Sequence, residues 1–113
     1  MARRIHRSAS DETAVESPQA MLKRRASRLA RKGEHRKAAL VLRDLVTRHE
    51  SAAAWVLLGS MLRLARRDDE AVAAWRQGLW LHRRDGAERR VRTVARLIHS
   101  LDPGDAKIAR LAA

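Results

Sequence analysis

The fold is decided by residues 52–85, AAAWVLLGSMLRLARRDDEAVAAWRQGLWLHRRD. In the first part of this stretch, apolar or small residues recur every three or four positions, which is the spacing of one face of an α-helix. The acidic run at 68–70 favours the start of a second helix, because carboxylates are stabilised at the positive end of the helix dipole. This helix extends to about His82, and residues 84–86, Arg-Asp-Gly, end it. The stretch therefore predicts two helices joined by a short turn.

The residues before this stretch predict two more helices. Ser17 and Pro18 favour a helix start, because a serine side chain caps free backbone N–H groups and proline loses no hydrogen bond at the first position. Gly33 ends the first of these helices, and residues 47–51 end the second. The apolar stripes of the two helices are Leu22, Ala26, Leu29 and Ala30, followed by Ala38, Leu42 and Leu45.

The residues after the stretch predict a fifth helix and a short last one. Residues 102–104, Asp-Pro-Gly, stop the fifth helix, and Asp105 is placed to cap a final helix that continues through Ala113. Residues 1–16 have no helical periodicity and predict a disordered basic N-terminal arm. The sequence thus predicts an all-α fold over residues 17–113, with five helices plus the short C-terminal helix. The fifth helix carries the apolar stripe Val91, Val94, Ala95, Ile98 and Leu101.

The composition agrees with one helical domain. The chain has 113 residues, enough for one compact core, and its apolar residues are almost all Ala, Leu, Val and Ile, with 3% aromatic residues. Because there is no cysteine, disulfides, thiolate metal sites and a cysteine nucleophile are excluded. The first residues contain no apolar signal region, and no apolar run reaches the roughly 18 residues of a membrane span. We therefore expect a soluble, cytoplasmic protein.

The stretch 52–85 resembles one full tetratricopeptide repeat, and pairs of helices about 34 residues long are typical of that family. The segment before it is similar more loosely and departs from the pattern at Arg25, while the segment after it is similar only in its first helix. The resemblance implies an array of about 2.5 helix-turn-helix units, as in small bacterial proteins of this family. It also implies that Gly59 allows a close approach of the paired helices, and that Ala71 and Gly78 leave room for Trp75. The residues at the signature positions are Trp55, Leu58, Gly59, Leu62, Ala71, Trp75 and Gly78.

The sequence contains no pattern typical of catalysis. The five histidines are scattered singly, so no pair of metal ligands shares a helical face, and no glycine-rich phosphate loop is present. The acidic run at 68–70 is explained as a helix start rather than as a cation site. We therefore expect no enzyme activity, no metal and no cofactor.

The resemblance implies a binding groove, because the first helix of each repeat in the family lines a concave surface that receives a peptide. The positions carried over include basic residues and no acidic one. The chain as a whole has a net charge of +12, which also fits an arginine-rich composition without a functional meaning. The groove residues implied are Lys23, Ser27, Arg31, Val56, Ser60, Arg63, Leu64, Arg89, Arg92, Arg96 and His99, with the smaller Ala20, Ala30, Ala53 and Ser100 beside them.

Trp80 is a separate candidate, because it lies one helical position from the apolar stripe of the fourth helix. A large ring at such a position favours packing on the fifth helix, or an interface with a second copy or another protein.

Two functions from different classes follow. The first is a protein-interaction module, a scaffold or small chaperone, that binds an acidic or amphipathic segment of another protein in the basic groove. The second is association with nucleic acid through arginines on the outer helix faces and the residues Arg3, Arg4 and Arg7. The scarcity of aromatic residues for base stacking favours the first. Neither function involves a membrane.

Overall fold

The computed structural model describes residues 15–113, and within that range the secondary structure is entirely helical. The all-α prediction is therefore confirmed, and the expected order of helices is found over these residues. The predicted arm at 1–16 falls for the most part outside the described residues; Val15 and Glu16 precede the first described helix without regular structure. The helices are α2 (Pro18–Arg31), α3 (His35–Arg48), α4 (Ala52–Leu64), α5 (Asp68–Arg84), α6 (Glu88–Leu101) and α7 (Ala106–Ala112).

Three helices begin at a side chain that caps a free backbone N–H group. Ser17 accepts a hydrogen bond at 3.1 Å from the amide of Ala20, as expected for the start of α2. Asp105 accepts one at 3.1 Å from the amide of Ile108 and so begins α7. This bond is the largest cause that lowers the pKa of the Asp105 carboxyl, and a hydrogen bond from Arg76 is the second. Ser51 caps α4 in the same way as Ser17.

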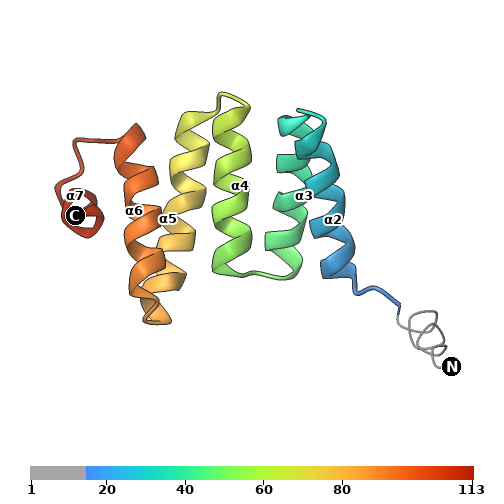
Figure 1. Ribbon diagram of the computed structural model, residues 1–113, viewed down its shortest axis with the longest axis horizontal. Coiled ribbons are helices and arrows are strands. Elements are labelled where there is room, and N and C mark those ends of the chain that lie inside the picture. The colour runs from blue at the N-terminus through green and yellow to red at the C-terminus, as the bar shows by residue number, and fades with distance from the viewer. Residues whose placement is uncertain (1–14) are drawn as a thin grey trace, which may run out of the picture.

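The helices stand side by side in one row that follows their order in the sequence (Figure 1). Each packs mainly on the helices before and after it in the chain. The pairs α2–α3 and α4–α5 are joined by turns of the same kind, since Gly33 has φ +78° and Arg66 has φ +64°, both in the left-handed region. The α5–α6 turn uses Gly86 with φ +69°. The two helix pairs therefore share their connecting geometry.

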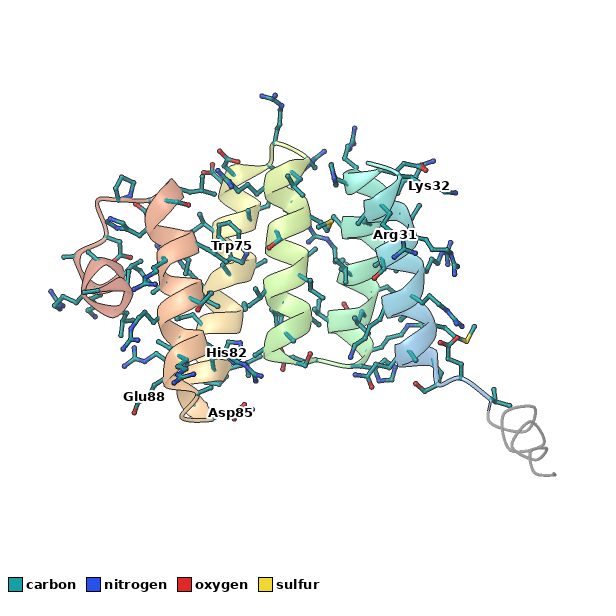
Figure 2. All side chains as sticks on the ribbon, viewed as in Figure 1. Arg31, Lys32, Trp75, His82, Asp85 and Glu88 are labelled. Carbon is teal, nitrogen blue, oxygen red and sulfur yellow. The ribbon has the colours of Figure 1, made fainter. Side chains whose placement is uncertain are left out.

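Trp75 of α5 is the largest fully buried side chain, with 1% of its surface exposed, and it lies within the row of helices (Figure 2). Its ring lies directly against the backbone of Gly59 in α4, so that a Cβ atom at Gly59 would collide with it. The indole N–H donates a hydrogen bond at 3.1 Å to the carbonyl oxygen of Val56. Trp75 thereby fixes α5 on α4 through both packing and a polar contact.

The expected role of Gly78 is wrong in one respect. A Cβ atom at Gly78 would lie 2.7 Å from Cγ2 of Val56 and 3.1 Å from the carbonyl oxygen of Ala52. Gly78 therefore makes room for the first turns of α4, and Gly59 is the glycine that accommodates the ring of Trp75. The physical reason is that the two helices are antiparallel, so that Gly59 opposes Trp75 and Gly78 opposes Val56.

His82 lies near the end of α5, where the chain turns into α6, together with Asp85 and Glu88 (Figure 2). It is buried, with 7% of its surface exposed. Burial lowers the pKa of His82, the positive charge of Arg90 lowers it further, and Asp85 opposes the shift. The folded protein therefore holds this imidazole in its neutral form more firmly than the unfolded chain does.

A fall in pH is expected to destabilise the protein through His82. Because the pKa of His82 is lower in the folded state, the unfolded chain binds the proton more readily. The free energy of unfolding should therefore decrease as the pH falls from about 7.5 through about 6.5, the ordinary pKa of histidine. Urea unfolding at pH 7.5 and 5.5 should show a smaller decrease for His82→Gln than for the wild type. Equal decreases in the two proteins would contradict this role of His82.

Candidate functional site

The groove residues implied by the sequence come from α2, α4 and α6, which run in the same direction along the row (Figure 1). Arg31 and Lys32 lie at the C-terminal end of α2, and Glu88 lies at the N-terminal end of α6, on the other side of the row (Figure 2). The exposed members are Lys23, Ser27, Arg31, Arg63, Leu64, Arg89, Arg92 and Arg96, and the half-buried members are Val56, Ser60 and His99. We call the exposed and half-buried side chains of this set, on α2, α4 and α6, the basic face.

Positive charge is concentrated on the helices of the basic face. Helices α2, α4 and α6 together carry ten Lys and Arg residues and one acidic residue, Glu88. Helices α3 and α5 carry seven Lys and Arg residues and four acidic ones. Because the acidic residues are placed mainly on α3, α5 and the connecting turns, the charge of the basic face is not neutralised by its own helices.

The acidic residues of α3, α5 and the turns are largely engaged in local pairs. Glu70 contacts Arg67 at 3.0 Å and Arg43 at 3.2 Å, and the hydrogen bond from Arg67 lowers the pKa of the Glu70 carboxyl. Glu34 contacts Lys37 at 3.0 Å, which lowers the pKa of the Glu34 carboxyl in the same way. Among residues 15–113, none of the ion pairs involves Lys23, Arg31, Arg63, Arg89 or Arg92.

The middle of the basic face is apolar. On α4, the residues Ala53, Leu57, Ser60 and Leu64 follow one another at spacings of four, three and four, which places them on one helical face. Leu57 is 47% exposed and Leu64 is 54% exposed. The implied groove did not include Leu57, although its spacing from Ser60 and Leu64 could have identified it. Helix α4 therefore carries an exposed apolar strip, and it stands between α2 and α6 in the row (Figure 1).

Two hollows of the surface adjoin the basic face. One, of about 400 Å³, is lined by Arg63, Leu64, Arg66 and Asp68 at the end of α4. The other, of about 410 Å³, lies where α6 meets α7 and has Arg92 and Arg110 among its lining residues. Each hollow combines apolar side chains and guanidinium groups with one acidic side chain, Asp68 in the first and Glu88 in the second.

Arg96 differs from the other groove arginines, because its side chain forms a hydrogen bond to the protein's own backbone. Its Nε donates a hydrogen bond at 2.9 Å to the carbonyl oxygen of Ala112, at the end of α7. The nearby His99 has a buried Nδ1 atom for which no hydrogen-bond partner is found among the described residues. Arg96 therefore stabilises the end of α7, where cations interact favourably with the helix dipole.

Arg76, which lies on α5 outside the basic face, also has a structural contact. Its guanidinium forms ion pairs at 2.9 Å with Asp102 and at 3.0 Å with Asp105. These contacts connect α5 to the turn between α6 and α7. Arg76 is consequently unsuitable as a surface arginine for a binding control.

Trp80 is 59% exposed, so its ring is not buried against α6. The guanidinium of Arg84, one turn further along α5, lies 5.5 Å from the centre of the ring. Packing on α6 therefore does not account for Trp80, and its role in an interface stays a prediction.

The part of the chain that the structure describes contains no group of three or more His, Asp or Glu residues placed to hold a metal ion. None of the helices over residues 15–113 has both the length and the apolar character that crossing a membrane requires. No protein-family model, curated protein or solved structure matches the chain.

Proposed function

We propose that this protein is an interaction module that binds an acidic, amphipathic segment of another protein across the basic face. The observation that carries the proposal is the distribution of charge: the basic face holds six Lys and Arg residues and no acidic one, and α2, α4 and α6 as whole helices carry ten against one. The acidic residues stand mainly in the turns and in the first turn of α5. The basic face therefore has no carboxylate of its own to neutralise it.

The geometry of the helix pairs supports a repeat array of tetratricopeptide type as the scaffold of this face. The α2–α3, α4–α5 and α5–α6 turns each contain one residue in the left-handed region, and helices pack mainly on their neighbours in the chain. In such an array, equivalent helices present equivalent faces, which creates an extended binding surface. The basic face would be that surface.

A ligand on this face would combine two kinds of contact. Its apolar side chains would pack on Leu57 and Leu64, which are half exposed in the free protein. Its carboxylates would pair with Arg31 on one side and with Arg89 and Arg92 on the other. Apolar contact supplies most of the affinity in such an interface, while charge complementarity supplies orientation and speeds association.

The test is a comparison of two triple charge reversals. The first replaces Arg31, Arg63 and Arg92 with glutamate, one on each helix of the basic face. The control replaces Arg36, Arg90 and Lys107, which are exposed, lie outside the basic face and line neither of the two hollows beside it, so that both variants have the same net charge. The probe is a fluorescent synthetic peptide in which Glu and Leu repeat at helical spacing, with a single-stranded oligonucleotide as the competing ligand.

The reversal on the basic face is expected to weaken peptide binding by about 100- to 1000-fold, at about 1 to 1.4 kcal/mol for each of the three lost pairs. The control should change it less than about threefold, because exposed charges away from an interface act only through long-range attraction. Fluorescence anisotropy at two salt concentrations measures both. Equal losses in the two variants, together with tighter and steeply salt-dependent binding of the oligonucleotide, would contradict the proposal and indicate phosphate binding.

A further inference from the structure

The outer side of α5 carries a continuous exposed stripe that the basic face does not use. Its residues are spaced by four, four, three and four positions, so they share one side of the helix. All of them are exposed, and Trp80 is the largest. At 1.5 Å per residue the stripe is about 22 Å long. We call it the α5 stripe; it consists of Asp69, Ala73, Gln77, Trp80 and Arg84.

The two ends of the α5 stripe have opposite charge. The first turn of α5 contains Asp68, Asp69 and Glu70, and its last turn contains Arg83 and Arg84. Among residues 15–113, no ion pair involves Asp69, and the ion pair of Arg84 with Asp85 is an exposed contact at 3.5 Å, beside the contact of Arg84 with the Trp80 ring. A helix with this distribution is complementary to a second helix of the same sequence that runs in the opposite direction.

We propose that two copies of this chain associate through the α5 stripe, with the two α5 helices antiparallel about a twofold axis close to Gln77. In this arrangement Asp69 of each copy lies opposite Arg84 of the other, and Ala73 lies opposite Trp80. Every contact then occurs twice, as a twofold interface requires. The helix dipoles are also antiparallel and therefore attract each other.

The surface next to Ala73 has room for the ring that this pairing places there. A hollow of about 260 Å³ adjoins the stripe; Trp55, Ala73 and Ala74 are among its apolar lining residues, and the paired side chains of Arg43 and Glu70 also line it. Because alanine is small, the indole of Trp80 from the second copy can cover Ala73 and enter this hollow. Aromatic side chains seated in apolar pockets are typical anchors of protein interfaces. The pairing thus accounts for a large ring that is 59% exposed in the single chain.

This interface is separate from the proposed peptide binding, because no residue of the α5 stripe belongs to the basic face. The net charge of +12 on each chain opposes association at long range. Added salt screens that repulsion more than it weakens the close pairs between Asp69 and Arg84. We therefore expect the dimer to strengthen between 0.05 M and 0.3 M salt, which is the opposite of the response of phosphate or acidic-peptide binding.

The decisive experiment is a charge exchange within the α5 stripe, followed by sedimentation equilibrium of the full chain at micromolar concentrations. Asp69→Arg alone and Arg84→Asp alone each create two repulsive pairs per dimer and should raise the dissociation constant at least about tenfold. The double variant D69R/R84D restores opposite charges across the axis and should return the constant to within about threefold of the wild type. Trp80→Ala should weaken the dimer at least about tenfold, whereas Leu64→Ala, an equally exposed apolar residue on α4, should not.

Disulfide cross-linking is a second test of the dimer, and it does not require a measured dissociation constant. The chain has no cysteine, so Gln77→Cys introduces a single thiol close to the twofold axis, where two facing helices bring Cα atoms within disulfide range. Mild oxidation should convert this variant to a covalent dimer much faster than Thr93→Cys, an exposed position on α6. A wild type that remains monomeric at both salt concentrations, a double charge variant no better than the single ones, or equal cross-linking at the two positions would overturn the proposal.

Discussion

Replacing Trp75 with alanine is expected to lower the free energy of unfolding by about 3–5 kcal/mol, the usual cost of truncating a fully buried aromatic side chain. Trp75 is 1% exposed, packs on Gly59 and donates a hydrogen bond to Val56, so that the substitution leaves a cavity between α4 and α5. Small domains are stable by only about 5–15 kcal/mol, and the loss is a large part of that range. Urea unfolding followed by far-ultraviolet circular dichroism measures it.

Trp80→Ala is the matched control for this prediction. It removes the same side chain from the same helix, but Trp80 is 59% exposed. At protein concentrations at which the chain is monomeric, Trp80→Ala should change the free energy of unfolding by no more than about 0.5 kcal/mol, as is usual for surface substitutions. Similar costs for the two variants would show that Trp75 does not form the contact between α4 and α5 described above.

The second prediction concerns Gly59→Ala. Whether this substitution raises or lowers the free energy of unfolding depends on the side chain at position 75. Alanine is the better helix former by about 1 kcal/mol, but a methyl group at Gly59 would collide with the ring of Trp75. Overpacking of this kind costs about 1–3 kcal/mol and so offsets or exceeds the gain in helix propensity. We therefore expect Gly59→Ala to destabilise the wild type by up to about 2 kcal/mol.

In the background of Trp75→Leu, the same Gly59→Ala substitution should stabilise the protein, because the shorter side chain leaves the space free. A double-mutant cycle measured by urea unfolding should give a coupling energy of about 2 kcal/mol. An additive cycle would mean that the glycine is needed for a reason other than the ring.

Much of the fold could be predicted, because the residues that begin a helix and the apolar stripe along it are local properties of the sequence. Ser17 with Pro18, the acidic run at 68–70 and Asp105 mark the beginnings of helices that the structure contains. The role of Gly78 could not be predicted in this way. Which glycine faces Trp75 depends on how α5 is placed against α4, and that placement involves residues 16 or more positions apart.

The candidate site shows the same division. The positions of the groove residues on α2, α4 and α6 follow from helical periodicity, which also could have identified Leu57. The contacts of Arg96 with Ala112 and of Arg76 with Asp102 could not be predicted, because they join residues 16 and 26 positions apart. Whether the side chain of an arginine is free to bind a ligand therefore depends on which turn or helix packs beside it, as for Arg96 and α7 or Arg76 and the turn after α6.

The arrangement of the helices in a row has a consequence for how the native state opens. Since each helix is held mainly by its two neighbours, an end helix can detach without disturbing the opposite end. The seven-residue α7 has a neighbour only in α6 among the strong contacts, yet Arg76 also connects its first turn to α5. Loss of that guanidinium contact would leave α7 held mainly by α6, so that this end of the array would open more readily than the centre, where Trp75 is enclosed.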